Sequence, residues 1–484
     1  MSGFSFKGLT IPFLLVLLVM CSTLDICDAG RGWDWRAGDE GKSGGGSSPT
    51  NPSQLTKPKP RPIPSPTPKP KPQPSPSPIP PAPHGTAFDV LDFGAKGDGT
   101  TDDTKAFQAA WAAACEVEAS RVVVPSKYEF LVGPVSFDGP TCQDNIVFQL
   151  DGTIIAPTDP KPWGSGLLQW LEFRKLRGLT IQGQGIIEGQ GNAWWSNKSL
   201  FDDNAQPSNE LSGKMPHTTP TALRLYGSNN VTVTGITIRN SPQCHLKFDS
   251  CDTVEVSDIT ISSPGDSPNT DGIHLQDSLN VFIHDVDLGC GDDCISIQTG
   301  CSSIYMHNIN CGPGHGISIG GLGKDNAEAT VSNITVQGAN MDNTLTAVRI
   351  KTWQGGSGYV KNIRFANVKV SEVQTPIIID QFYCDSGRCK NQSSAVALSE
   401  ITYEGIRGTY TVQPVHLACS DNIPCSNIHL NDIELELLNQ HEHVYEPFCW
   451  QAYGELQSPT EPPINCLHSE KLKINQIHSD QGSN

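Results

Sequence analysis

The 484-residue sequence has no apolar run long enough to cross a membrane. Its longest run, residues 9–21, has 13 mostly apolar residues, short of the ~20 that a transmembrane helix needs. Lys7 precedes this run and Ala29 offers a plausible cleavage point, which is the pattern of a secretory signal. We therefore expect residues 1–29 to be a signal peptide. We expect a soluble, exported protein with no membrane contact after the signal is removed.

Positive charge is also scarce. Lys and Arg number 33 against 51 Asp and Glu, a formal net charge of −18. Residues 1–85 are net positive by four charges, which leaves about −22 for residues 86–484. So acidic a region lacks the basic surface that binds nucleic acid through its phosphates. An acidic polymer would be repelled at long range, so only local positive charge in a binding site could hold one.

Proline is unevenly distributed. Sixteen of the 37 prolines lie between Pro49 and Pro83, alternating with Ser, Lys and Thr. Such a stretch cannot bury enough apolar area to fold, and an extended, polyproline-like chain is expected. We interpret residues 30–85 as a disordered Pro/Ser/Lys-rich linker. It is either a solvated spacer or a basic contact arm for an anionic matrix. Residues 86–484 are expected to form one folded domain.

Cysteine use fits an exported protein. Without Cys21 and Cys27 of the signal, 14 cysteines remain, an even number that suggests disulfides. Close pairs are expected to staple turns, and the cysteines between 290 and 311 do not have the spacing of a zinc site. We expect no metal. The close pairs are Cys384 with Cys389 and Cys419 with Cys425.

Four Asn-X-Ser/Thr sequons lie in turn-rich contexts, where an exported protein can be N-glycosylated. The predicted sites are Asn197, Asn230, Asn333 and Asn391.

Long helical patterns are rare, and a strand-like repeat takes their place. The sequence Val-Thr-Val-Thr-Gly-Ile-Thr-Ile at 231–238 recurs at 254–261, at 281–288 and, more loosely, at 304–311, in steps of 23, 27 and 23 residues. Alternation of β-branched and polar residues indicates strands with one buried face. A repeat of this length without helices predicts a solenoid of stacked coils, an all-β parallel β-helix. Fainter copies start at Val331, Val360 and Ile428.

One helical segment, Thr104–Cys115, is expected near the start of the domain. Its apolar face can close one end of the solenoid, and Asp102 or Asp103 can cap it. We interpret the acidic residues before it as turn and cap residues and not as a calcium site. The glycine-rich residues 183–191 lie between strand-like runs, which argues against a dinucleotide-binding loop and favours tight corners between coils.

Four polar clusters interrupt the apolar pattern between residues 269 and 351. The second follows the first by 21 residues and the third follows by 23. In a β-helix, this spacing places Asp271, Asp292 and His315 on three successive rungs, ~4.8 Å apart. The clusters are Asn269-Thr270-Asp271, Gly291-Asp292-Asp293, Gly314-His315-Gly316 and Arg349-Ile350-Lys351.

The clusters contain the groups that glycoside hydrolysis needs. One carboxylic acid protonates the leaving oxygen, and a second carboxylate activates water or attacks the sugar. Crowded carboxylates raise the pKa of at least one of them. Asp292 and Asp293 could face one cleft only if Gly291 introduces a bend or bulge. His315 could then tune the proton on Asp292.

Two cations complete the set. Arg349 and Lys351 alternate in a strand and so point to the same side. They form either structural ion pairs or a clamp for the carboxylate of an acidic sugar, and we favour the clamp.

The four clusters, in this order and spacing, resemble those of the polygalacturonase family of pectin-degrading glycoside hydrolases, and the plant-type secreted members are most similar. The resemblance covers about residues 87–466. It implies a right-handed parallel β-helix that hydrolyses α-1,4-galacturonosyl links with inversion and without a metal or cofactor.

The resemblance also implies site residues. Asp292 would be the general acid, Asp271 and Asp293 would position the attacking water, and His315 would support protonation of the acid. Arg349 and Lys351 would bind the galacturonate carboxylate. The remaining implied residues are Tyr383 and Asn269 in substrate binding, and Cys294 with Cys311 as a disulfide that braces the site.

The expected protein is therefore a secreted, monomeric, extracellular polygalacturonase that acts on pectate (homogalacturonan) in cell-wall pectin remodelling. Two alternatives stay open at this point: a calcium-dependent pectate lyase and a non-catalytic pectin-binding β-helix. Endo or exo attack depends on loops that the sequence does not resolve.

Overall fold

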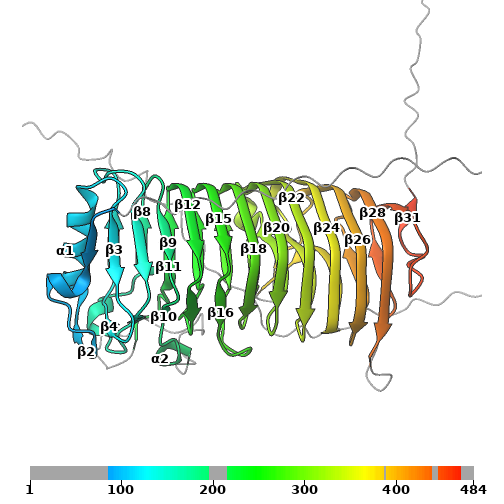
Figure 1. Ribbon diagram of the computed structural model, residues 1–484. Helices are drawn as coiled ribbons and strands as arrows, with labels where there is room; N and C mark the ends of the chain where they lie inside the picture. The colour runs from blue at the N-terminus through cyan, green and yellow to red at the C-terminus, as the bar shows by residue number, and fades with distance from the viewer. Residues whose placement is uncertain (1–84, 196–214, 386–388, 439–444, 470–484) are drawn as a thin grey trace, which may run out of the picture. The chain divides into compact units, whose positions relative to one another are not determined.

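The computed structural model describes residues 85–195, 215–385, 389–438 and 445–469 (Figure 1). The predicted signal peptide and all but the last residue of the predicted linker lie outside these ranges. From Gly85 onward the described chain winds into stacked coils, and every pairing between neighbouring strands is parallel. The predicted parallel β-helix is confirmed.

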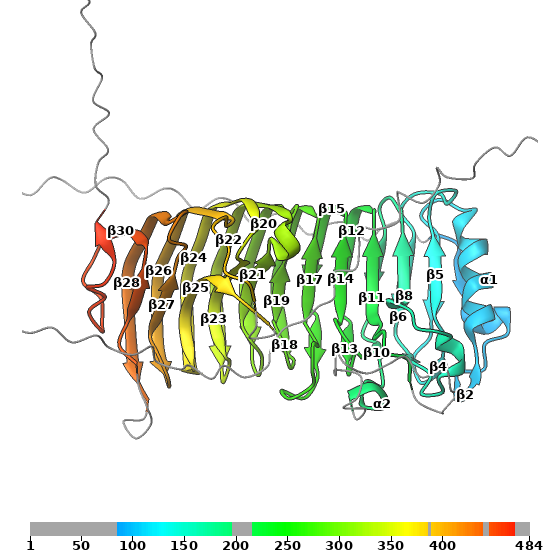
Figure 2. The ribbon, with the colours of Figure 1, turned by 180° about the vertical axis from the view of Figure 1, so that it is seen from behind.

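The coils build two parallel sheets, one of 11 strands and one of 20. Figure 2 shows the strands of the smaller sheet side by side from β5 to β27. The smaller sheet comprises β5 (Val135–Asp138), β8 (Gln169–Arg174), β11 (Thr221–Tyr226), β14 (Leu246–Asp249), β17 (Ile273–Gln276), β19 (Ile295–Ile297), β21 (Ile317–Leu322), β23 (Thr346–Trp353), β25 (Thr375–Tyr383), β27 (Val415–Ala418) and β29 (Phe448–Trp450).

The larger sheet takes up the rest of each coil, and its later strands are long because they run through a bend. It comprises β1 (Ala87–Asp89), β2 (Asp98–Asp102), β3 (Arg121–Val124), β4 (Glu129–Leu131), β6 (Val147–Leu150), β7 (Thr153–Ile155), β9 (Thr180–Gln182), β10 (Ile186–Glu188), β12 (Asn229–Thr234), β13 (Thr237–Arg239), β15 (Asp252–Ser257), β16 (Thr260–Ser262), β18 (Leu279–Gly289), β20 (Ser302–Cys311), β22 (Glu328–Asp342), β24 (Ser357–Val373), β26 (Ala397–Tyr410), β28 (Cys425–Leu437), β30 (Ala452–Leu456) and β31 (His468–Ser469).

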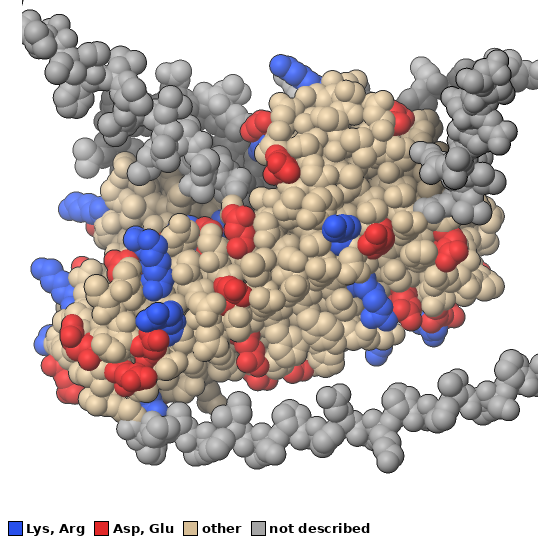
Figure 3. Space-filling model, turned by 90° about the horizontal axis from the view of Figure 1, so that it is seen from above, with Lys and Arg blue, Asp and Glu red and all other residues tan. Residues whose placement is uncertain are grey.

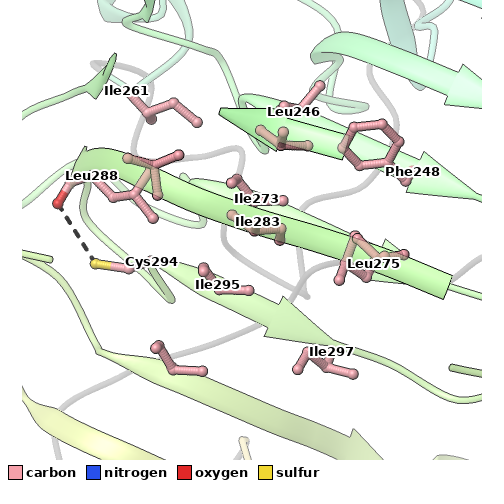
Figure 4. Packing of buried hydrophobic residues seen from close by; sticks show 14 of the residues in the cluster. Leu246, Phe248, Ile261, Ile273, Leu275, Ile283, Leu288, Cys294, Ile295 and Ile297 are labelled. Atoms are coloured by element: carbon pink, nitrogen blue, oxygen red, sulfur yellow. Dashed lines mark hydrogen bonds between the residues drawn. The ribbon is translucent and has the colours of Figure 1, made fainter. Parts of the chain in front are cut away.

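The core consists of ladders of identical or similar apolar residues. Leu246 pairs with Ile273, which pairs with Ile295, and all three are fully buried (Figure 4). A second ladder of buried residues runs beside it through Phe248, Leu275 and Ile297. Because each rung buries its apolar face against the next, no coil is stable alone and the stack is the cooperative unit.

The predicted repeat matches the observed register in its clearest copies. Val231 pairs with Val254, Val254 with Val281, and Val281 with Ile304. The next rungs continue at Ile334 and Ile363, so the faint copies at Val331 and Val360 were aligned three residues too early. The faint copy at Ile428 is in register.

The reason for that misalignment is a backbone bend. Asn333 has φ 58° and Asn362 has φ 55°, a left-handed conformation that Asn tolerates better than most residues. The bend breaks the two-residue alternation within each strand. A pattern read as one continuous strand therefore slips out of phase.

Helix α1 (Thr104–Cys115) covers the first coil, with the predicted bounds. Trp111 packs against Phe137 and Phe173, with ring centroids 5.1 and 5.4 Å away. Asp102 accepts the backbone N–H of Thr104, while the N-cap residue, Asp103, binds the loop before the helix. These carboxylates are used by turns and the helix start, as predicted. Short helices elsewhere are α2 (Asn192–Trp195), η1 (Val90–Phe93), η2 (Lys161–Trp163) and η4 (Lys324–Asn326).

The glycine-rich residues 183–191 form corners. A Cβ on Gly183 would lie 1.9 Å from the carbonyl oxygen of Leu150, so no larger residue fits there. Just beyond the corner, Trp194 is fully buried against Trp163 in an edge-to-face contact. The interpretation of these residues as tight corners between coils is confirmed.

Five disulfides link cysteines of the described chain, including both predicted close pairs. The other four cysteines join none of these five bridges: Cys251, Cys290 and Cys301 are buried thiols, and Cys244 is buried as well. Their side chains fill core and corner positions, where a small apolar group packs well. The bridges are Cys115–Cys142, Cys294–Cys311, Cys384–Cys389, Cys419–Cys425 and Cys449–Cys466.

Acidic and basic side chains are interspersed on the face shown in Figure 3, and neither sign gathers into one large field among the residues coloured there. Among the helices of the described residues, none has the length and apolar character to span a bilayer.

Candidate active site

The predicted clusters lie on neighbouring coils of the 11-stranded sheet. Asp271, Asp293 and His315 each come two residues before an isoleucine that begins a strand, and these three isoleucines pair with one another. The three side chains therefore start from equivalent points on successive rungs. Asp292 comes one residue earlier on the same coil as Asp293.

The bend predicted at Gly291 is present. Gly291 and Asp292 lie in a bend, and residues 291–293 all precede β19 and are not within the strand. The amide of Gly291 donates to Oγ1 of Thr270 (2.9 Å), and a Cβ at Gly291 would lie 1.8 Å from the carbonyl oxygen of Ser267. Close backbone approach therefore requires glycine here and lets both aspartates face the same side.

Asp292 is fully buried. Its Oδ1 lies 3.0 Å from Nδ1 of His315 and accepts the backbone N–H of Asp293 at 2.7 Å. Its Oδ2 is buried and has no hydrogen-bond partner within the described part of the chain. A buried carboxylate oxygen without a donor is poorly stabilised as an anion, so this oxygen is the natural position for a proton.

Asp293 has the opposite surroundings. Its Oδ1 accepts from Nη2 of Arg349 (2.6 Å) and from Oγ of Ser318 (2.7 Å), and its Oδ2 accepts from Nζ of Lys351 (3.0 Å). Burial alone would raise the pKa of Asp293, but the charges of Lys351 and Arg349 outweigh it and hold the pKa well below its usual range. Asp293 is therefore ionised at any pH at which the protein would work.

Asp271 is held by two histidines that sequence reasoning did not identify. Its Oδ2 lies 3.0 Å from Nδ1 of His274. Its carbonyl oxygen lies 2.8 Å from Nδ1 of His245, whose Nε2 contacts the hydroxyl of Ser263. Burial lowers the pKa of His245 to about 4, so this ring is neutral and acts as a hydrogen-bonding prop beneath Asp271.

Arg349 and Lys351 point to the same side of β23, as their alternation predicted, and both are almost fully buried. The structure shows that they are ion-paired with Asp293, which was the reading we had disfavoured. The pairing does not consume all their donors. Lys351 donates one of its three N–H groups to Asp293, and Arg349 also donates Nε to Ser318.

Tyr383 and Asn269 flank these groups. Nζ of Lys351 lies 5.3 Å from the centroid of the Tyr383 ring, and this ring packs edge-to-face on Trp353. Asn269 is half-buried with φ 53° in the loop that leads to Asp271. The Cys294–Cys311 disulfide joins the residue that follows the two aspartates to the last residue of β20, shortly before His315, the pair that the resemblance implied.

Two of the missed residues, His274 and Ser318, share one signal. His274 follows Asp271 by three residues, and Ser318 follows His315 by three. Arg349 occupies the equivalent position on the next rung, since Ser318 pairs with Arg349. The anchor-plus-three position of each coil therefore faces the site, and reading it at every repeat would have found them.

Two groups of side chains have the chemistry of metal ligands, with ligand atoms within 4.8 Å of one another: Asp292, Asp293 and His315 form one, and Cys244, Asp271 and His274 the other. In the first, both oxygens of Asp293 already contact cationic side chains, which leaves little excess negative charge for a metal ion. The cysteines considered as a zinc set cannot act together, because two of them form a disulfide.

Three of the four predicted glycosylation sites lie within the residues that the structure describes. Asn230, Asn333 and Asn391 are exposed, and Asn197 lies outside the described residues. Asn333 differs from the others because its Nδ2 donates to Ser302 (3.3 Å) and its Oδ1 accepts from Asn362 (2.7 Å). Glycosylation of all four stays a prediction.

The rigid β-helix presents buried carboxylates with opposite environments on one face, beside a histidine and two cations. Fold and site together define a β-helical glycoside hydrolase.

Comparison with known proteins gives the family. Residues 115–446 match the family described as "Glycosyl hydrolases family 28". A probable polygalacturonase of Arabidopsis thaliana is 43% identical over 391 residues, which cover 80% of this chain and 85% of the relative. The chain belongs to glycosyl hydrolases family 28.

Solved structures agree on the fold. A polygalacturonase from Erwinia carotovora superposes with a TM-score of 0.60 at 23% identity, covering 76% of this chain and 99% of that chain. An endopolygalacturonase I from Stereum purpureum, solved with two galacturonates, gives 0.52 at 19% identity, covering 70% of this chain and 95% of that chain. The fold is therefore the right-handed parallel β-helix.

Proposed function

We propose that this protein is a secreted polygalacturonase that hydrolyses α-1,4-galacturonosyl links of de-esterified pectin, with inversion and without a metal. The observation that carries the proposal is the division of labour between the adjacent carboxylates. Asp292 has an oxygen suited to a proton, and Asp293 is held ionised by Arg349 and Lys351. The relatives named as polygalacturonases support the choice of substrate.

Asp292 is the general acid in this scheme. As the bond between C1 and the glycosidic oxygen breaks, Asp292 transfers its proton to that oxygen, and the leaving sugar departs with a free hydroxyl. His315, in contact with Oδ1, holds the carboxyl in position and stabilises the carboxylate that the transfer leaves behind. A proton from solvent restores the acid.

Asp271 and Asp293 hold the water that attacks C1 from the opposite face, which inverts the configuration. The cations that lower the pKa of Asp293 also make it a poor base. Asp271 therefore takes the proton of the water, and its contact with His274 orients the carboxylate.

Arg349 and Lys351 bind the carboxylate of a galacturonate while they neutralise Asp293. Lys351 has donors left after its bond to Asp293, and Arg349 has donors left after its bonds to Asp293 and Ser318. A neutral sugar would leave those buried cations with fewer partners, so the pair selects an acidic sugar. Tyr383, beside Lys351, forms one wall of this sugar site, and Asn269 flanks Asp271.

The proposed location is the extracellular space and the cell wall. It is supported by the signal-like residues 1–29 and by disulfides, which persist in oxidising compartments.

The product profile from polygalacturonate, measured with and without a chelator, tests the proposal. We expect saturated oligogalacturonides and new reducing ends at a rate that the chelator does not change. Unsaturated products that disappear with the chelator would identify a calcium-dependent lyase instead. Binding of polygalacturonate without any product would identify a non-catalytic binding protein.

A further inference from the structure

The 11-stranded sheet continues past the catalytic coils toward the C-terminal end of the fold (Figure 2). Because its strands pair in register, outward-facing side chains stack in ladders. The ladder that starts at Arg349 continues on β25, β27 and β29 through Ile378, His416 and Phe448. The ladder that starts at Lys351 continues through Asp380, Ala418 and Trp450.

The kinds of side chain on the outer face of the sheet change along the two ladders. Neither contains a Lys or Arg after Arg349 and Lys351. Both end on β29 in large exposed aromatic side chains, Phe448 at 40% and Trp450 at 47%. Cys449, between them, turns inward to its disulfide with Cys466, so the two rings share the outer face.

Both rings are fixed by neighbours that leave part of them exposed. Phe448 stacks on His416 with ring centroids 4.9 Å apart and an interplanar angle of 22°. Nε1 of Trp450 donates to Oδ1 of Asp421 at 2.8 Å. Rigid aromatic rings bind a partner at little cost in conformational entropy.

We propose that Phe448 and Trp450 form a platform that binds an uncharged sugar residue of the same polysaccharide chain, three rungs beyond Arg349 and Lys351. This inference rests on the proposed function, since it needs a polysaccharide in the catalytic cleft. Three rungs correspond to ~14 Å, a distance that a continuous chain of a few sugars spans. The apolar C–H face of a pyranose is suited to an exposed aromatic ring.

The electrostatics define the class of sugar. Asp421 accepts the indole N–H of Trp450 beside the platform, and neither ladder carries a cation there. Burial lowers the pKa of His416 to about 4, so its ring is neutral and does not attract an anion. A free galacturonate carboxylate would be repelled, whereas a methyl-esterified galacturonate or a neutral sugar would not be. The cleft would thus bind an acidic residue at Arg349 and an uncharged residue at its C-terminal end.

The test compares selectivity in the full-length protein and in Trp450→Ala and Phe448→Ala. The quantity measured is kcat/KM on partly methyl-esterified pectin divided by kcat/KM on fully de-esterified polygalacturonate. We expect each substitution to lower this ratio by roughly tenfold, the effect of losing one well-placed aromatic contact. Trp450→Phe should restore much of it. Tyr305→Ala, which removes a similarly exposed aromatic ring from the other sheet, should leave the ratio unchanged.

A binding experiment identifies the ligand. The Asp292→Asn protein, with and without Trp450→Ala, is titrated with trigalacturonate, its methyl ester and a neutral galactan oligosaccharide of the same length. The proposal expects Trp450→Ala to weaken binding of the methyl ester, of the neutral sugar, or of both, and the pattern shows which source the platform uses.

The outcomes distinguish a failure of the aromatic platform from a failure of the proposed function. If the protein hydrolyses polygalacturonate but the ratio is the same in all variants, the platform is wrong and the proposed function stands. If Trp450→Ala lowers both activities equally, aromatic binding exists but its selection of uncharged sugars is wrong. If the unsubstituted protein hydrolyses neither polymer, the proposed function itself fails.

Discussion

Nδ1 of His315 lies 3.0 Å from Oδ1 of Asp292, although 23 residues separate them along the chain. One full coil of the β-helix brings the two residues together. A second contact joins them, since the amide of His315 donates to the carbonyl oxygen of Asp292 at 2.7 Å. The backbone bond fixes the distance between the coils, and the side-chain bond fixes the orientation of the carboxyl group.

Asp292→Asn should abolish most hydrolysis. The amide keeps the shape of the side chain and can still accept from His315, but it cannot donate an acidic proton. We expect kcat to fall by about 10²- to 10⁴-fold, the usual contribution of a general acid. Reducing-end release from polygalacturonate measures it, with oligogalacturonide binding as the control for an intact cleft. A variant with the unsubstituted rate would show that another group is the acid.

Asp293→Asn should destabilise the fold strongly. Removal of this charge leaves Arg349 and Lys351 buried without their counter-ion, a change that costs roughly 3–5 kcal/mol. The matched control is Asp432→Asn, which breaks the exposed ion pair of Asp432 with Arg407 and should cost less than about 1 kcal/mol. Chemical denaturation of both variants gives the comparison. Equal losses would contradict the structural role of the buried ion pairs.

Asp380 predicts a pH-dependent stability. Burial raises its pKa to about 6, above the ~3.9 of an unfolded chain. Between these values the folded state keeps a proton that the unfolded state has released, so the free energy of unfolding falls as pH rises. The loss amounts to roughly 3 kcal/mol and is complete above the folded pKa.

In Asp380→Asn this contribution disappears. Relative to the unsubstituted protein, the variant should gain stability between about pH 4 and pH 6 and differ little below pH 4. Denaturation curves at several pH values for the two proteins measure the difference. Parallel stability profiles across this range would show that Asp380 does not titrate as its burial implies.

Gly291→Ala should impair catalysis by displacing the loop. The new methyl group would lie 1.8 Å from the carbonyl oxygen of Ser267, so the bend carrying Asp292 and Asp293 must shift. Misplacing catalytic groups by about 1 Å can cost roughly 10²-fold in rate. Kinetics on polygalacturonate test this, and Gly265→Ala, whose Cβ would meet only side-chain atoms of Pro313 at 3.1 Å, serves as a control. A fully active Gly291→Ala would mean that the loop tolerates the shift.

The sequence predicted what depends on local pattern. Alternation at 231–238 and its early copies predicted the strands and their register. The 21- and 23-residue spacings of Asp271, Asp292 and His315 predicted successive rungs. The glycine before Asp292 predicted the bend. Each of these signals is contained within one coil or in the interval between two coils.

Features that depend on particular side-chain contacts between coils were missed. The hydrogen bond of His245 to the carbonyl oxygen of Asp271 has no local signature in the sequence. The choice between a clamp and ion pairs at Arg349 required the position of Asp293, which lies two rungs away. The register failed for the faint copies at Val331 and Val360 because the backbone bends at Asn333 and Asn362, where the residue pattern suggests a continuous strand.

The strand pairings join each coil to the one before it and the one after it. Tension applied to the two ends of the chain would therefore unfold the terminal coils first, one coil at a time. Asp271, Asp292, His315 and Lys351 occupy four adjacent coils, with β25, β27 and β29 between them and the C-terminal end. Those outer coils would have to strip away from that side before the reacting groups separate.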